Sequence, residues 1–233
     1  MMFFGKKPLS GIWTDATDSH SHILPGVDDG VSDMETSLSI LEAYEKLQIR
    51  EVWCTPHVME DIPNTTEGLK ARFAELQAAY KGPVRLNLAA EYMMDGLFLE
   101  RLEKDDLLTH GHDGNALLVE TSYYTPPMDL HSILESIKRK GYYPILAHPE
   151  RYLYMKMSDY APLKKMGLRF QLNVAALSGA YGDDAVKKAH HLLKEGSYNY
   201  IGSDIHRLRQ LQIWDARVPK KWLALVEGIR DKG

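Results

Sequence analysis

Short apolar runs alternate with amphipathic patterns of helical spacing along almost the whole chain. After a first strand-like stretch that ends near 18–22, the apolar runs predict buried strands at 51–55, 85–90, 116–119, 144–147, 169–174 and 198–202. Between the strands, hydrophobic residues three and four apart predict helices over 34–47, 69–80, 130–137, 186–193 and 219–229. Such alternation is typical of a parallel sheet, and six or seven repeats favour a closed barrel over an open sheet.

Polar residues mark where three of these helices begin. Ser32 or Asp33 is the expected N-cap of the first helix, and Thr65 or Thr66 that of the second. Pro219 suits the first turn of the last helix, because its missing N–H has no partner there anyway. No linker, low-complexity segment or block of charge divides the pattern, so we expect one domain over residues 1–233.

The composition is that of an ordinary globular protein, with 44% hydrophobic and 26% charged residues. A net charge of −4 argues against a dedicated nucleic-acid binder, which usually carries a basic face. The single cysteine, Cys54, excludes an internal disulfide framework and suits a reducing compartment. Residues 1–7 do not form a signal-peptide core, and no apolar stretch is long enough to span a membrane. We therefore expect a cytoplasmic protein; the sequence does not indicate its oligomeric state.

Candidate chemistry first appears at the end of the first strand. His20 and His22 alternate there and are followed by Asp28 and Asp29. Residues i and i+2 of a strand point to the same face, so the two imidazoles could bind one metal ion together. A single His-x-His is a weak signal, because surface histidines two apart are common.

The same kinds of side chain follow the later apolar runs. They are His57, Glu91, Glu120, His148 and the pair Asp204 and His206. Taken singly, each could be a structural histidine or a solvated carboxylate. In β/α barrels, however, the carboxyl ends of the strands converge on one face, which holds the active site. The set as a whole therefore predicts a metal-dependent hydrolase.

These residues lie in motifs that resemble a known superfamily. The run from Asp18 to Gly30 reads Asp-x-His-x-His-x-Leu-Pro-Gly-Val-Asp-Asp-Gly, which is similar to the first motif of the polymerase and histidinol phosphatase (PHP) superfamily. The later motifs match in order: Thr55-Pro56-His57, Ala90-Glu91-Tyr92, Val119-Glu120-Thr121, Ala147-His148-Pro149-Glu150-Arg151-Tyr152 and Gly202-Ser203-Asp204-Ile205-His206. More narrowly, the chain resembles the metal-dependent protein-tyrosine phosphatases encoded with bacterial capsular and exopolysaccharide genes.

The resemblance implies a distorted (β/α)7 PHP-type barrel with three divalent metal ions at the carboxyl ends of the strands. Its ligand sets, carried over by motif, are His20, His22, Glu91 and Asp204 for the first ion; Glu91, Glu120 and His148 for the second; and Asp29, His57 and His206 for the third. Either Asp28 or Asp29 could be the ligand, and the motif favours Asp29. Imidazole and carboxylate without thiolate suit manganese, iron or zinc, and we expect Mn²⁺ first.

This donor set predicts phosphoryl chemistry. Clustered cations lower the pKa of a bridging water, and the resulting hydroxide would attack phosphorus. Arg151 lies three residues after His148, and its planar fork of donors suits a phosphate. Arg207 and Arg209 could assist, or could belong to a solvated basic loop. No Cys-x5-Arg loop is present around Cys54, which argues against a thiol mechanism.

Three functions remain open at this point. The first is hydrolysis of phosphotyrosine in a protein, which the resemblance suggests is a bacterial tyrosine kinase that controls polysaccharide synthesis. The second is a small-molecule phosphatase of the same superfamily, such as one acting on histidinol phosphate. The third is a non-catalytic metal-binding or regulatory module, which the complete set of ligand types disfavours.

A few further residues are ambiguous. Tyr123 and Tyr124 directly follow the Glu120 motif and either line the mouth of the site or serve packing. Tyr152 and Tyr154 likewise either line the mouth of the site or serve packing. His110 and His112 form another His-x-His, but they follow a polar stretch, so we expect both at the solvated surface.

Overall fold

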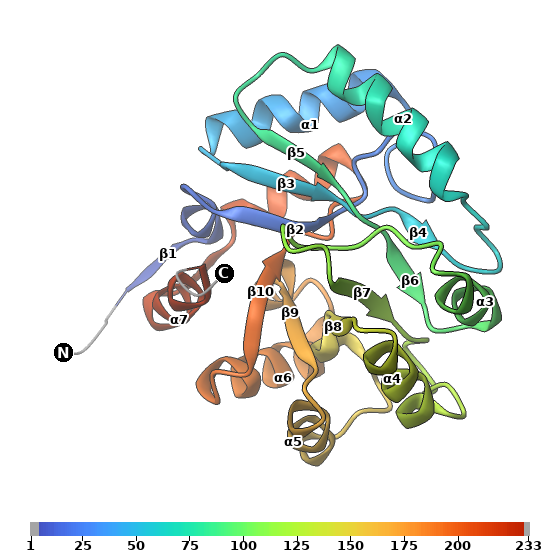
Figure 1. The fold of residues 1–233 in the computed structure, drawn as a ribbon. Helices are drawn as coiled ribbons and strands as arrows, with labels where there is room; N and C mark the ends of the chain where they lie inside the picture. The colour runs from blue at the N-terminus through green and yellow to red at the C-terminus, as the bar shows by residue number, and fades with distance from the viewer. Residues whose placement is uncertain (1–4, 231–233) are drawn as a thin grey trace.

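Parallel strands form the centre of the molecule (Figure 1). The computed structural model describes residues 5–230, so the ends of the predicted domain, including residues 1–4 of the amino terminus, lie outside the described residues. The strands are β1 (Lys6–Pro8), β2 (Thr17–Ser21), β3 (Glu51–Cys54), β4 (His57–Val58), β5 (Arg85–Leu88), β6 (Glu91–Met93), β7 (Ala116–Glu120), β8 (Tyr143–Ala147), β9 (Arg169–Asn173), β10 (Tyr198–Gly202) and β11 (Arg217–Pro219).

The strands form two parallel sheets and a small ribbon. One sheet has the order β10-β9-β8-β7-β6-β4 and the other the order β2-β3-β5, while β1 and β11 pair antiparallel. A parallel bridge between Ser21 and Ile205 joins the edges of the two large sheets. At that junction the His22 N–H donates to the Ile205 carbonyl at 3.0 Å, and the Asp204 N–H donates to the His20 carbonyl at 2.8 Å. The junction therefore places β2 directly beside the segment that follows β10.

Helices connect the strands and lie on the outside of the sheets (Figure 1). They are α1 (Met34–Lys46), α2 (Thr66–Ala79), α3 (Gly96–Lys104), α4 (Leu130–Arg139), α5 (Met157–Lys165), α6 (Gly182–Lys194) and α7 (Lys220–Arg230). Short 3-10 helices cover Leu9–Ile12, Pro149–Arg151, Val174–Ser178 and Leu208–Asp215. The α/β class with parallel strands is confirmed.

The structure shows which residues cap α1 and α2, and it corrects the predicted start of the last helix. Asp33 is the N-cap of α1, because its carboxylate accepts from the Thr36 N–H at 2.8 Å. Thr65 caps α2 in the same way through the Gly68 N–H. Pro219 does not begin the last helix: it is the last residue of β11, and α7 begins at Lys220. The sequence pattern also missed α3 and α5.

Both faces of the central strands are buried, which explains their continuous apolar sequence. On β7, Leu117 and Val119 belong to the main hydrophobic core, while Ala116 and Leu118 belong to a second cluster that also includes residues of β8. Within residues 5–230, no helix is long and apolar enough to cross a membrane.

Candidate metal centre

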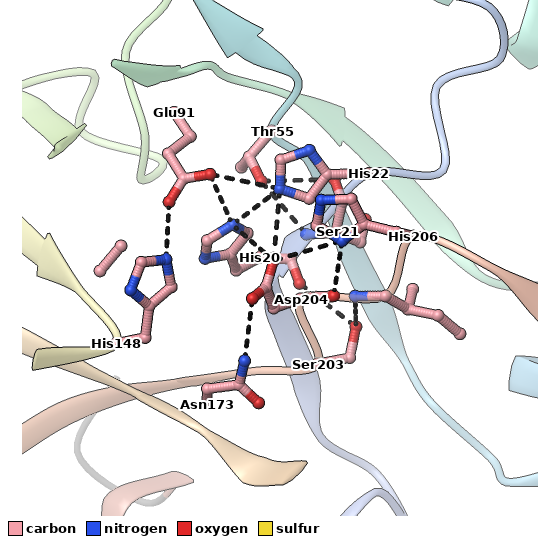
Figure 2. Close-up of polar contacts among 12 residues, drawn as sticks. His20, Ser21, His22, Thr55, Glu91, His148, Asn173, Ser203, Asp204 and His206 are labelled. Atoms are coloured by element: carbon pink, nitrogen blue, oxygen red, sulfur yellow. Dashed lines mark hydrogen bonds and ion pairs between the residues drawn. The ribbon is translucent and has the colours of Figure 1, made fainter. Parts of the chain in front are cut away.

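Nine side chains that the sequence predicts as metal ligands come together near or after the carboxyl ends of β2, β7, β8 and β10 and at the first residues of β4 and β6. They are His20, His22, Asp29, His57, Glu91, Glu120, His148, Asp204 and His206. Figure 2 shows His20, His22, Glu91, His148, Asp204 and His206 pointing toward one another from separate strands and loops. Most of these side chains are buried, and the outer members Asp29, His57 and His206 are more accessible.

The tightest group consists of His20, His22, Glu91 and Asp204. The two Nε2 atoms lie 3.0 Å apart, and Glu91 Oε2 lies 3.1 and 3.2 Å from the His20 and His22 Nε2 atoms. Asp204 Oδ1 lies 3.5 and 3.4 Å from the same two nitrogens. Ligands about 2.1 Å from a tetrahedral ion stand roughly 3.4 Å apart, so this spacing fits a single metal ion.

A second group shares Glu91. Its Oε1 lies 3.0 Å from His148 Nε2, which is 3.8 Å from Glu120 Oε2. His57 Nδ1 lies 3.2 Å from both Glu91 Oε2 and Glu120 Oε1, yet this buried nitrogen has no hydrogen-bond partner. A buried nitrogen without a partner between two carboxylates fits a site that is completed by a cation.

In the third group, Asp29 rather than Asp28 points toward the histidines. Asp29 Oδ1 lies 3.6 Å from His57 Nε2 and 3.5 Å from His206 Nε2. Asp28 instead accepts from His22 Nδ1 at 2.8 Å and from the His57 backbone N–H at 3.0 Å. Asp29 is thus placed as a ligand would be, and Asp28 orients His22 from behind.

Two of the residues in the cluster adopt a backbone conformation that non-glycine residues rarely use. His148 has φ 34° and Asp204 has φ 52°. Left-handed conformations of this kind cost free energy and persist where the surroundings impose them, as they commonly do at functional sites.

The electrostatics of the cluster favour ionised carboxylates. Burial alone would raise the pKa of Glu91, but His20 and His57 hold it well below its usual range. Burial is likewise outweighed at Asp204, whose pKa is held well below the usual value by His20, His22 and Arg151. The cluster therefore offers anionic oxygens together with imidazole nitrogens, which is the donor chemistry of a divalent metal site.

Strand β9 carries none of the predicted ligands, yet it orients two of them. Gln171 Nε2 donates to the Ser19 carbonyl and hydroxyl, so its Oε1 faces His20 Nδ1 at 2.6 Å and accepts from it. This leaves His20 Nε2 as the nitrogen that faces Glu91 and Asp204. Asn173 Nδ2 donates to Asp204 Oδ2 at 2.9 Å (Figure 2). Neither amide was predicted from the sequence, although polar residues at i and i+2 within an apolar run were a usable signal.

Gly202 on β10 allows the close packing behind His20. A Cβ atom at this position would stand 2.5 Å from the His20 Cβ and 3.3 Å from the Gln171 amide. Only a residue without a side chain fits between the two strands here.

Arg151 lies at the edge of the cluster, as the sequence predicts. Its Nη1 donates to Asp204 Oδ2 at 2.5 Å, and its guanidinium lies over the rings of Tyr123 and Tyr181, at 4.6 and 4.2 Å from their centroids. These cation–π contacts and the bond to Asp204 restrict the orientation of the guanidinium.

A cavity of about 430 Å³ opens over the cluster. Beyond the ligand residues and Arg151, its lining comprises Met59, Met93, Thr121, Ser122, Tyr123 and Tyr124. Tyr123 and Tyr124 therefore line the site, whereas Tyr152 is completely buried and serves packing. A smaller hollow of about 340 Å³ lies between α3 and α4, and no histidine is among its described lining residues.

The structure does not bring Arg207 and Arg209 into this cavity. Both residues are exposed, and neither is among the described residues that line it. Their predicted role in binding phosphate has no geometric support, so only Arg151 enters the proposal below.

One sequence prediction about histidines is wrong. His110 is not at the surface: it is 2% exposed, stacks on Trp53 at 4.4 Å and has its Nε2 3.0 Å from the Ser19 carbonyl. His112 is exposed, as predicted, and pairs with Glu51 at 2.9 Å. The error arose because the polar loop folds back over β2 and β3, where His110 contacts Ser19 and Trp53, and local sequence does not reveal this.

Comparison with known proteins agrees with this geometry. The model of the family described as capsular polysaccharide synthesis, CpsB/CapC, matches residues 16–219. The chain belongs to this family. The matched range of this CpsB/CapC family member contains all nine clustered side chains and Arg151.

Named relatives within the family are similar over most of their length. The tyrosine-protein phosphatase CpsB of Streptococcus agalactiae is 29% identical over 210 residues, which cover 82% of this chain and 83% of that protein. The tyrosine-protein phosphatase YwqE of Bacillus subtilis is 25% identical over 198 residues, covering 82% and 78%.

The fold of this CpsB/CapC family member also matches a solved structure. That structure comes from work on YwqE from Bacillus subtilis and CpsB from Streptococcus pneumoniae, described as unique metal-dependent tyrosine phosphatases. The TM-score is 0.77 at 23% identity, and the match covers 90% of this chain and 85% of the other. At this identity the likeness supports the fold.

Proposed function

We propose that this protein is a metal-dependent phosphatase that hydrolyses phosphotyrosine in proteins. The observation that carries the proposal is the convergence of nine potential ligands, seven of which line a cavity that also presents Arg151. Membership of the CpsB/CapC family, whose named relatives are tyrosine-protein phosphatases, supports the same reaction.

We propose three divalent ions as the cofactors, with Mn²⁺ first and Fe or Zn as alternatives. The residues that would hold them are His20, His22, Glu91 and Asp204; Glu91, Glu120 and His148; and Asp29, His57 and His206. When bound, the ions would supply an activated water as the nucleophile and neutralise charge on the phosphoryl oxygens.

The remaining chemistry belongs to the chain itself. Arg151 would bind the phosphoryl group through the donors that Asp204 does not occupy, and the two tyrosine rings would restrict the orientation of the guanidinium. Met59, Met93 and Tyr123 line the cavity above and provide apolar surface for an aromatic ring. This lining favours an aryl phosphate such as phosphotyrosine over a polar metabolite such as histidinol phosphate.

The wider setting follows from the family. We propose that the substrate is a bacterial tyrosine kinase that controls capsular or exopolysaccharide synthesis, and that the reaction takes place in the cytoplasm. We also propose one domain over residues 1–233, in which β3 with β4 and β5 with β6 are interrupted single strands. With β2, β7, β8, β9 and β10 they would form a distorted (β/α)7 barrel.

The test is phosphate release in the presence of Mn²⁺, comparing a phosphotyrosine peptide with histidinol phosphate at equal concentration. We expect preference for the peptide and complete loss of activity with a chelator. Preference for histidinol phosphate would instead make the protein a small-molecule phosphatase, and activity on neither would refute the proposed substrates.

Two variants test the mechanism within the same assay. Glu91→Ala should abolish turnover and reduce the bound metal, because Glu91 contacts two ligand groups. Cys54→Ser should retain activity, because Cys54 is fully buried in β3 and burial raises the pKa of its thiol. Loss of activity in a folded Cys54→Ser protein would contradict the metal mechanism.

A further inference from the structure

Two exposed apolar side chains lie where the loops after β7 and β8 meet. Tyr124 is 74% exposed and lines the cavity, and Leu153 is 59% exposed. A backbone hydrogen bond of 2.8 Å from the Leu153 N–H to the Tyr123 carbonyl joins the two loops beside these side chains. We refer to Tyr124 and Leu153 together as the rim platform.

Stacked aromatic rings stabilise the loops that carry the platform. Tyr123, Tyr152 and Tyr154 stack in order, with centroids 6.1 and 5.7 Å apart and interplanar angles of 30° and 27°. Thr121 ties the same loops, since its Oγ1 lies 2.7 Å from the Tyr154 hydroxyl and its N–H donates to the Tyr152 hydroxyl at 3.3 Å. Lys188 of α6 adds a buried hydrogen bond to the Tyr152 carbonyl at 2.7 Å.

Rigid backbone and exposed apolar surface together are characteristic of a binding surface. Apolar side chains on mobile loops can fold away from water, whereas Tyr124 and Leu153 are attached to loops fixed by hydrogen bonds and stacked rings. Held in this way, they remain exposed unless a partner covers them. Met128, four residues beyond Tyr124, is also fully exposed.

We propose that the rim platform binds the substrate polypeptide next to the phosphotyrosine and selects an apolar residue there. This inference rests on the proposed phosphatase function. With the phosphoryl group at Arg151 on the cavity floor, the substrate main chain leaves through the mouth, of which Tyr124 is part. Tyr124 belongs to the cavity lining, and the hydrogen bond from the Leu153 N–H to the Tyr123 carbonyl places the Leu153 backbone beside that lining, so an apolar neighbour of the phosphotyrosine would be buried against Tyr124 and Leu153.

A small phosphate ester would be hydrolysed within the cavity, so contact with the rim platform would not contribute to its binding. The platform therefore distinguishes a polypeptide substrate from a free phosphate ester. Burying one aliphatic side chain is worth roughly tenfold in kcat/KM against a serine at the same position.

The experiment compares phosphotyrosine peptides that differ only in carrying Leu or Ser on either side of the phosphotyrosine. We expect the wild-type protein to prefer a leucine peptide by roughly tenfold in kcat/KM, and Leu153→Ser to reduce that ratio to near one. Tyr124→Ser should reduce the ratio as well. Leu225→Ser is the matched control, because Leu225 is 40% exposed on α7, a helix that lies well away from α4 (Figure 1).

The outcomes separate this inference from the proposed function. Turnover of all peptides without preference, or a preference that survives Leu153→Ser, would overturn the platform and leave the phosphatase intact. Loss of self-association in the Leu153→Ser variant with unchanged peptide preference would assign the surface to a second copy of the chain and also overturn it. Failure of the wild-type protein to hydrolyse any phosphotyrosine peptide would refute the proposed function, and the platform with it.

Discussion

Replacing Gln171 by leucine isolates the contribution of β9 to the metal centre. Gln171 is 1% exposed, and its Oε1 is the acceptor for His20 Nδ1 at 2.6 Å. Leucine fills much of the same space but accepts no hydrogen bond, so the His20 Nδ1–H loses its partner in a buried setting. The Ser19 carbonyl keeps a second contact, at 3.0 Å from His110 Nε2, which limits the damage to the His20 side.

The size of the effect follows from that single lost acceptor. An unsatisfied buried donor costs about 1–3 kcal/mol, and loss of a group that orients a metal ligand typically weakens binding by about 10–100-fold. The first figure applies to folding stability; for metal binding, tenfold corresponds to about 1.4 kcal/mol. We therefore expect Gln171→Leu to bind metal about 10–100-fold more weakly than the wild-type protein.

The assay is competition for metal between the purified protein and a chelating dye, with folding checked by circular dichroism. Gln171→Glu should recover much of the affinity, because a carboxylate oxygen can again accept from His20 Nδ1. Asn199→Leu is the control, since the Asn199 side chain accepts from Lys164 and Phe170 and contacts none of the ligands. Wild-type affinity in Gln171→Leu, or equal weakness in Gln171→Glu, would refute the orienting role.

Three further predictions concern the ligands, the packing and the response to acid. Asp29→Asn should lower the metal content by one ion per chain in elemental analysis, because Asp29 contacts the third group only. Gly202→Ala should cost about 1–3 kcal/mol in denaturant unfolding, because its Cβ would stand 2.5 Å from that of His20, whereas Gly228→Ala on α7 meets open space and should not destabilise. Burial lowers the pKa of His110 to about 4, so unfolding takes up a proton below about pH 6.5 and stability falls as the pH drops from there toward 4. Unfolding free energies measured across that range should fall less steeply in His110→Gln, and an unchanged slope would exclude His110 as the cause.

The sequence by itself determined the class of fold and the identity of the clustered donors. Hydrophobic periodicity is a local property, so strands and most helices could be predicted from neighbouring residues. Potential ligands at strand ends could be grouped because parallel strands must bring their carboxyl ends to one face. His20, Glu91 and Asp204 were predicted together on this ground and lie together in the structure.

Only the tertiary structure decided the roles that depend on contacts between distant segments. Asp28 and Asp29 are adjacent in sequence, and only the position of His22 and His206 shows which one faces the cluster. His110 looks like a surface residue until the loop that carries it folds back over Trp53.

The hydrogen bonds that orient the clustered side chains also join segments that are far apart in the sequence. Gln171 lies 151 residues from His20, and Leu153 meets Tyr123 across a separate strand and its loop. Local pattern carries no information about such pairs, because their distance depends on how the β9–β10 edge of one sheet packs against β2 and on how the loops after β7 and β8 pack against each other. The clustered side chains were therefore predictable from the sequence, whereas the residues that orient them depend on the folded chain, as do the two residues of the platform.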